Sequence, residues 1–248
     1  MTQPTAADSL RRAADVMRAV REKCVWSQQI THRDLVPYLV EESAELIDAV
    51  EDGSRADVRE ELGDLLWQVL FHAEIASRAT ADPFDIDDVA TGLVDKMVRR
   101  HPHVFGDAVA RTPEDVLVLW NAAKAAEKHE RRSVLDGVSD RMPSLALAQK
   151  LLGRVAALPE ASRIGISGEN RRDAAIVGRD ADSHRGAPSE PATEAELGDA
   201  LLALVARARE NGWDAERALR ERLRRLEDEV RAVEASAPFA AAAGDLEE

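Results

Sequence analysis

Residues 35–76 read LVPYLVEESAELIDAVEDGSRADVREELGDLLWQVLFHAEIA, and the apolar positions of this stretch decide the fold. They recur every three or four residues, which is the spacing of a helix with one apolar face. Gly53 interrupts the pattern, so the stretch predicts two helices, Leu35–Val50 and Ala56–Ser77. The second helix is apolar around most of its circumference, and we expect such a helix to be buried.

Helical spacing continues on both sides of this pair. Hydrophobic residues make up 45% of the chain but aromatic residues only 4%, a mixture that suits packed helices better than a sheet. The sequence therefore predicts an all-α helical bundle. The further helices are expected over residues 8–22, 86–100, 112–131, 145–157, 194–210 and 214–233.

The charge of the chain limits its partners. Asp and Glu number 47 against 33 Lys and Arg, which gives a formal net charge of −14. Such a surface repels a phosphate backbone and argues against duplex nucleic acid, but a small phosphate ligand can still bind through a divalent cation. Cys24 is the single cysteine, and no stretch has the apolar length of a signal peptide or a membrane span. We expect a soluble, cytoplasmic protein without a membrane partner.

Acidic residues are concentrated without basic neighbours in the first predicted helix of the pair. Between Arg33 and Arg55 the chain has no Lys or Arg, while seven acids stand there: Asp34, Glu41, Glu42, Glu45, Asp48, Glu51 and Asp52. Like charges three or four residues apart destabilise a helix by a few tenths of a kcal/mol each. Something positive is therefore expected close to them in the folded protein.

The helical wheel places two acid pairs beside apolar faces. Glu42 and Glu45 border the core-facing side of their helix, and Glu61 and Asp64 share a face with Gln68 on the next one. Either string alone is most often a solvated helix face. Two such pairs on neighbouring, largely apolar helices favour a cage for a hard cation, and Mg²⁺ prefers carboxylate oxygens.

A basic cluster follows the acids. Lys96, Arg99 and Arg100 could grip terminal phosphates, although positive side chains at a helix C-terminus also complement the helix dipole. Trp120 and Lys124 lie on one face of a later helix, where the ring could stack on a base or serve as a half-buried packing residue.

Several of these strings together resemble the MazG family. Its pattern of Glu-Glu-x-x-Glu followed by Glu-x-x-Asp stands here as Glu41-Glu42-Ser43-Ala44-Glu45 and Glu61-Leu62-Gly63-Asp64. The similarity is dense from Cys24 to Lys150. Its other family-like strings are Trp26 with Gln29, Thr31-His32, Pro37-Tyr38-Leu39, Arg99-Arg100-His101-Pro102-His103-Val104-Phe105, Trp120 with Lys124, and Ser133-Val134-Leu135-Asp136-Gly137-Val138.

This resemblance implies a function and a set of site residues. It implies helical bundles paired into dimers or higher homo-oligomers, and Mg²⁺-dependent hydrolysis of NTP or dNTP to the monophosphate and pyrophosphate, with Mn²⁺ as a substitute. The implied metal ligands are Glu42, Glu45, Glu61 and Asp64. Glu41 is implied either to support the metal ligands from behind or to help orient the attacking water. The implied substrate-binding residues are Lys96, Arg99, Arg100, Trp120 and Lys124.

The chain also departs from the family pattern. Val25-Trp26-Ser27 stands where the family has Pro-Trp-Asp. Glu196 and Asp199 repeat the second acid pair without a preceding Glu-Glu-x-x-Glu, so we expect the C-terminal half to lack catalysis. The expected organisation is an N-terminal helix (1–22), a catalytic MazG-like domain (23–135), a connecting helix (136–158), a polar linker (159–193), a degenerate second MazG-like half (194–235) and a flexible tail (236–248).

Two other functions are compatible with a carboxylate-bearing bundle. A ferritin-like di-iron site needs Glu-x-x-His on two helices, and no His here lies three residues after a Glu, which argues against this class. A non-catalytic nucleotide- or metal-binding regulatory module of the same fold is the second alternative. For the hydrolase itself, the family resemblance implies nucleotide-pool house-cleaning, with damaged or non-canonical nucleotides as substrates.

Overall fold

The computed structural model describes residues 6–127, 133–156, 158 and 191–236 of the 248-residue chain. The described residues form helices and no strand, which confirms the predicted all-α class. The chain divides into two compact units, residues 1–129 and 130–248, and each is described by itself. No described helix combines the length and the apolar character needed to cross a membrane.

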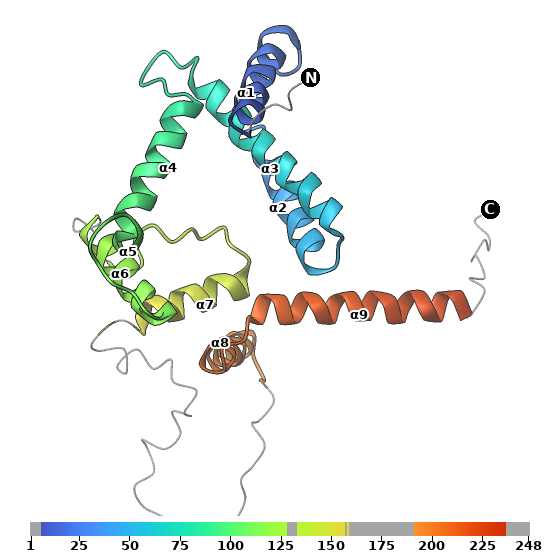
Figure 1. The fold of residues 1–248 in the computed structure, drawn as a ribbon. Coiled ribbons are helices and arrows are strands. Elements are labelled where there is room, and N and C mark those ends of the chain that lie inside the picture. The colour runs from blue at the N-terminus through green and yellow to red at the C-terminus, as the bar shows by residue number, and fades with distance from the viewer. Residues whose placement is uncertain (1–5, 128–132, 157, 159–190, 237–248) are drawn as a thin grey trace, which may run out of the picture. The chain divides into compact units, whose positions relative to one another are not determined.

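The first unit is built on three helices, α1 (Ala6–Lys23), α2 (Val36–Glu51) and α3 (Arg55–Ala76). Both α1 and α2 pack against α3 (Figure 1). The buried residues between them include Met17 from α1, Leu35 just before α2, and Phe71 from α3. This core fixes the register in which α2 and α3 present their acids.

A tight turn joins α2 to α3 and requires glycine at one position. A Cβ added to Gly53 would lie 2.7 Å from both the Cα and the carbonyl oxygen of Ala49, closer than side chains normally approach backbone. Ser54 then caps α3, because its Oγ accepts hydrogen bonds from Ala56 N and Asp57 N, while Asp57 Oδ2 accepts from Ser54 N at 2.7 Å. This reciprocal cap satisfies backbone donors that a helix start leaves free.

The remainder of the first unit comprises α4 (Ile86–Arg100), α5 (Pro102–Phe105) and α6 (Pro113–Ala126). Reciprocal caps begin α4 at Asp85 and α6 at Thr112. The short α5 was not predicted. α4 contacts α5 and α6, and these contacts position the basic end of α4.

The second unit contains α7 (Ser144–Val155), α8 (Glu194–Glu210) and α9 (Ala215–Ser236). Its core is small: Leu152 from α7 packs with Val205 and Ala206 from α8. The predicted linker and tail fall mainly on residues 159–190 and 237–248, which lie outside the described residues, as does the predicted end of the helix over residues 128–131.

One expectation about burial was only partly right. α3 is a helix where predicted, and Leu70 and Phe71 are buried, but Leu62 and Val69 are exposed. The apolar circumference of α3 exceeds what α1 and α2 cover, because two neighbouring helices shield only part of a helix surface.

Candidate metal and nucleotide site

Three of the predicted ligands meet between α2 and α3. Glu42 and Glu45 lie on adjoining turns of α2, and Glu61 lies on the facing side of α3. Each contributes a carboxylate oxygen, and the three oxygens all lie within 4.8 Å of one another. The turn at Gly53 makes this meeting possible, because it brings the two helices back along each other (Figure 1).

Asp64, the fourth predicted ligand, lies beside this group. Its charge raises the pKa of both Glu42 and Glu61 by repulsion, so its carboxylate is near both. It is exposed and is not one of the three acids that lie within 4.8 Å of one another. Asp64 therefore adds negative charge to the site at its solvent side.

The surroundings of Glu42 and Glu61 disfavour the charged form of both carboxylates. Burial raises the pKa of Glu42, and repulsion from Asp64, Glu45 and Glu41 raises it further. Burial likewise raises the pKa of Glu61, with repulsion from Glu45 as the next largest cause. Such mutual repulsion in a partly desolvated site is relieved when a cation binds between the carboxylates.

Two buried oxygen atoms at the site lack a hydrogen-bond partner. They are Oε2 of Glu61 and Oε1 of Gln68. Gln68 is only 2% exposed and lies one turn beyond Asp64 on α3. A buried oxygen without a donor is unfavourable, whereas a carboxylate oxygen is a normal ligand of a hard cation. The residues present thus fit a divalent ion such as Mg²⁺.

Glu41, predicted to orient water, is placed at the edge of the site. Its side chain is exposed on α2, and its charge contributes to the raised pKa of Glu42. Its predicted role stays a prediction.

The basic cluster at the end of α4 is held by an acid that sequence reasoning missed. Glu127 follows α6, and its Oε2 accepts a hydrogen bond from Arg100 Nη2 at 2.6 Å, while Arg99 Nε lies 3.4 Å from Oε1. Hydrogen bonding from Arg100 is the largest cause that lowers the pKa of Glu127. Arg100 is largely buried and Arg99 is exposed; Lys96 lies one turn earlier and is half-buried.

Aromatic contacts complete this cluster. The Arg100 guanidinium lies 5.1 Å from the centre of the Trp120 ring, and His101 meets the same ring edge-on at 5.0 Å between centroids. Trp120 therefore packs against α4 in the described structure. Lys124, one turn further along α6, is half-buried.

Two histidines, His32 and His72, form a pair next to the acid site. His32 and His72 stack with their planes 5° apart, and their Nδ1 atoms lie 2.7 Å from each other. Burial, followed by repulsion from His32, lowers the pKa of His72. The pair joins the loop before α2 to α3, one turn beyond Gln68.

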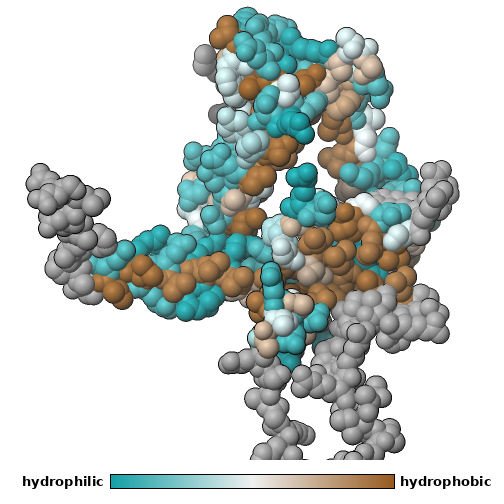
Figure 2. All heavy atoms as spheres, turned by 180° about the vertical axis from the view of Figure 1, so that it is seen from behind, coloured by the Kyte–Doolittle hydropathy of each residue, from teal (hydrophilic) through white to brown (hydrophobic). Residues whose placement is uncertain are grey.

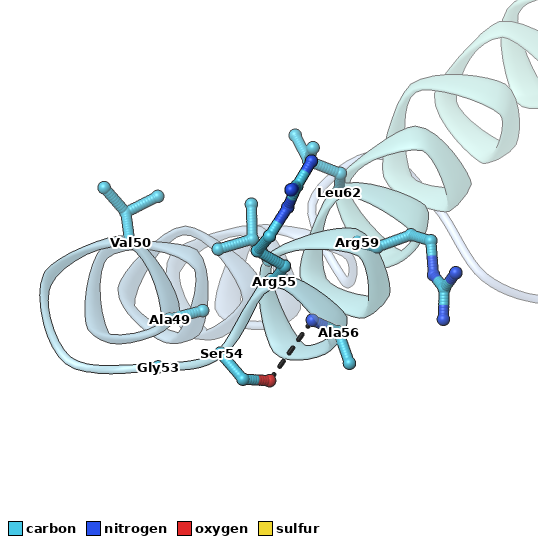
Figure 3. Close-up of a pocket in the computed structure, with 9 residues that line it drawn as sticks. Ala49, Val50, Gly53, Ser54, Arg55, Ala56, Arg59 and Leu62 are labelled. Carbon is cyan, nitrogen blue, oxygen red and sulfur yellow. Dashed lines mark hydrogen bonds between the residues drawn. The ribbon is translucent and has the colours of Figure 1, made fainter.

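The end of the α2–α3 hairpin carries a pocket of about 780 Å³. Apolar side chains such as Val50 and Leu62 line it together with Arg55 and Arg59, and Figure 3 shows the Arg59 side chain pointing away from the other lining residues. None of the predicted site residues lines this pocket.

Comparison with known proteins agrees with the motifs that form this site. A family model described as the MazG nucleotide pyrophosphohydrolase domain matches residues 30–105, which include all five candidate acids. The nucleoside triphosphate pyrophosphohydrolase of Escherichia coli strain K12 is 32% identical over 240 residues, which cover 92% of this chain and 88% of that protein. The chain belongs to the MazG family.

Other MazG-family relatives match with different coverage. An uncharacterized 26.1 kDa protein from Streptomyces cacaoi is 46% identical, over 89% of this chain and 80% of its own. The nucleoside triphosphate pyrophosphohydrolase of Mycobacterium tuberculosis is 50% identical over 57% of this chain, but the match spans only 43% of that protein. A crystal structure of a MazG-related protein from Thermotoga maritima aligns with a TM-score of 0.41 and 24% identity, covering 46% of this chain and 97% of that one.

Proposed function

We propose that this MazG protein hydrolyses nucleoside triphosphates, NTP or dNTP, to the monophosphate and pyrophosphate in a reaction that requires Mg²⁺. The observation that carries the proposal is the meeting of Glu42, Glu45 and Glu61 within 4.8 Å, with a buried and unpaired oxygen on Glu61. The names of the relatives from E. coli and M. tuberculosis support the reaction class. Clearance of non-canonical nucleotides and assembly into a homo-oligomer belong to the same proposal.

The residues divide the work between ion and substrate. Glu42, Glu45 and Glu61 would hold the ion, with Asp64 as a further ligand on the solvent side and Glu41 orienting the attacking water. The ion, when bound, polarises phosphoryl oxygens and activates water for attack between the α and β phosphates. Mn²⁺, which also accepts carboxylate ligands, would substitute for Mg²⁺.

The basic cluster would bind the triphosphate. Lys96 and the exposed Arg99 would contact phosphate oxygens, while Arg100 supports them through its contacts with Glu127 and Trp120. Arginine forks match phosphate oxygens well, which suits Arg99 to this role. Trp120 and Lys124 would lie near the nucleoside.

A matched pair of variants tests the proposal. Glu61→Gln should abolish pyrophosphate release from a panel of normal and modified NTPs in Mg²⁺, because the neutral amide is a poor ligand. Glu60→Gln, a neighbouring exposed acid outside the three-acid group, should retain the wild-type rate. Circular dichroism of both variants checks that the helices remain.

Two results would contradict the proposal. Full activity of Glu61→Gln would remove this residue from the site. Wild-type protein that releases no pyrophosphate above a metal-free blank would favour the non-catalytic binding module.

A further inference from the structure

An exposed apolar seam runs along α9. Leu219, Leu223, Leu226, Val230 and Val233 are separated alternately by four and three residues, and each is 45–66% exposed. Figure 2 shows apolar side chains along this helix. Alternating spacing of this kind is the seam through which one helix packs against another in a coiled coil.

The first turn of α9 is attached to the core of its own unit. Ala215 packs against the small core of α7 and α8, and its backbone N–H donates to Gln149 Oε1 at 3.1 Å. This anchors the first turn of α9. The apolar residues from Leu219 onward remain exposed within the described part of the chain.

Along both edges of the seam, basic residues come first and acidic residues follow. Arg220 and Arg222 flank its first half, and Glu227 and Glu229 flank its second half. Contacts within the helix use all four groups. Arg222 Nη2 lies 3.5 Å from Glu229 Oε2, Arg231 Nη2 lies 3.1 Å from Glu227 Oε2, and Arg220 Nη1 lies 3.7 Å from Glu216 Oε1. The first two pairs are at least half exposed, so each stabilises the helix little and can be exchanged for another contact; the Arg220 pair is less exposed.

We propose that α9 pairs with α9 of a second copy of this chain in an antiparallel coiled coil. In that orientation Arg220 of one copy faces Glu227 of the other, and Arg222 faces Glu229, so every flanking contact is attractive. A parallel pair would set Arg222 against Glu227 of the other copy, which is attractive, but also Glu229 against Glu234, which is repulsive, on both edges. The antiparallel arrangement is favoured because it has no repulsive flanking contact.

The apolar layers agree with the same two-fold symmetry. When the pair is centred between Arg224 and Arg225, Leu219 opposes Val230 and Leu223 opposes Leu226, each contact occurring twice. The seam is shorter than the three to four heptads typical of an independent coiled coil. We therefore expect dimers whose population rises with protein concentration. This inference deepens the proposed homo-oligomer and does not depend on hydrolysis.

Charge reversal in the full-length chain tests the pairing. Sedimentation of Arg220→Glu/Arg222→Glu and of Glu227→Arg/Glu229→Arg should each show self-association weakened about tenfold or more, because all flanking contacts become repulsive. An equimolar mixture of the two variants should restore it. Wild-type association of either variant alone, or no recovery on mixing, would overturn the proposal.

Orientation needs a separate measurement. A spin label on Glu234→Cys in a Cys24→Ser background reports the distance between the two copies of α9. The antiparallel pair places these labels about 28 Å apart along the axis, from the rise of 1.5 Å per residue, whereas a parallel pair brings them within roughly 15 Å. The short distance, or no distance between copies, would overturn the antiparallel assignment.

A different observation identifies a positioning residue at the acid site. Gln68 is only 2% exposed, and its side-chain amide lies close enough to the Glu42 carboxylate to lower the pKa of that group. Its Oε1 is buried and has no partner. An orphan acceptor lowers the stability of the protein, so an apolar side chain of similar length would be the more stable choice at this position.

We infer that Gln68 orients Glu42 for metal binding and keeps Oε1 as an acceptor for water at the site. The inference rests on the proposed metal-dependent function. Groups that hydrogen-bond to metal ligands orient them, and their loss weakens metal affinity by 10- to 100-fold in other proteins. Gln68 would act through Glu42 rather than as a ligand itself.

If Gln68 supports metal binding at a cost in stability, its replacement should lower the metal affinity without lowering the stability of the metal-free protein. Gln68→Met should weaken Mn²⁺ binding, measured by titration calorimetry, about 10- to 100-fold, while the metal-free protein melts at the same or a higher temperature. Mn²⁺ affinity equal to that of the wild type, or a lower metal-free melting temperature, would overturn the inference. Failure of the wild type to bind Mn²⁺ would instead contradict the proposed metal site.

Discussion

At the scale of single residues, the acid site is a local instability that a ligand can relieve. Glu42 and Glu61 both have raised pKa values because of burial and mutual repulsion, and Glu61 carries a buried oxygen without a donor. Residues that only stabilised the fold would pair these acids with bases, as Arg78 pairs with Glu74 at 2.7 Å. Among the described residues no base pairs with these acids, which is the reason to expect a cation there.

Removal of the metal therefore has a measurable consequence. Mg²⁺ at millimolar concentration should raise the melting temperature of the wild type above its value in EDTA by several degrees, because a ligand that binds only the folded state stabilises it. Glu61→Gln should show a much smaller increase, and Glu60→Gln the full one. Equal increases in all three proteins would place the bound ion elsewhere.

The histidine pair predicts a pH dependence of stability. His72 has a lowered pKa in the folded protein, so folding disfavours its protonation. Its contribution to stability is full above the ordinary histidine pKa of about 6.5 and is lost as the pH falls through the lowered value. The melting temperature should fall more steeply below pH 6.5 in the wild type than in His72→Gln. Parallel melting curves for the two proteins would contradict this role.

At the scale of helices, local signals decided which elements could be predicted. α4 and α8 begin and end where the sequence indicated, because Asp85 and Thr193 cap their starts. α5 could not be predicted, since four residues after His101 contain too few positions for a periodic pattern. Helix identity is a local property, and its boundary signals lie in the sequence itself.

The same distinction explains which site residues were found. The acids of α2 and α3 could be predicted because a short turn joins the helices and each carries an i, i+3 pair. Glu127 could not, since its contact with Arg100 spans 27 residues and depends on how α6 packs against α4. Gln68 was placed on the correct face, but its contact with Glu42 depends on the depth at which α3 is buried.

The cap of α3 is predicted to support the acid site. Ser54→Ala should lower the free energy of unfolding by about 1 kcal/mol, because two backbone donors lose their acceptor. Ser43→Ala is the matched control, since Ser43 lies within α2 and donates only to Val40 O at 2.8 Å. Urea denaturation of both variants measures the difference. An equal loss in the two would show that the cap is not the cause.

The two arginines of α4 are predicted to separate binding from stability. Arg100→Ala should lower the melting temperature, because it removes the contacts with Glu127 and Trp120 and leaves the partly buried Glu127 with only the longer contact to Arg99. Arg99→Ala should raise KM for the triphosphate with little change in melting temperature, since Arg99 is exposed. If Arg99→Ala destabilised the protein as strongly, its main role would be structural.

At the scale of the whole molecule, the two units carry different parts of the MazG pattern. The first unit holds the segment that matches the family model and both acid pairs. The second repeats Glu196-Leu197-Gly198-Asp199 and offers the exposed seam of α9. This division is consistent with chemistry in one unit and association through the other.

Glu196, in the second Glu-x-x-Asp string, makes different contacts from Glu61 in the first. Its Oε2 accepts a hydrogen bond from Ala192 N at 2.7 Å, and its own N–H donates to Thr193 Oγ1 at 3.2 Å, so the side chain caps the start of α8. Glu61, at the corresponding position of the first repeat, has a buried oxygen with no partner. A carboxylate that already satisfies backbone donors at a helix start has less reason to bind a cation.

Turnover should therefore be insensitive to Glu196. Glu196→Gln is expected to keep kcat and KM within about twofold of the wild type, since glutamine retains a cap acceptor and the site acids are untouched. Glu61→Gln, measured in the same pyrophosphate-release assay, should lose nearly all activity. A large loss of kcat in Glu196→Gln with unchanged helical content would mean that the second unit contributes to catalysis, because loss of the cap alone would affect stability rather than the chemical step.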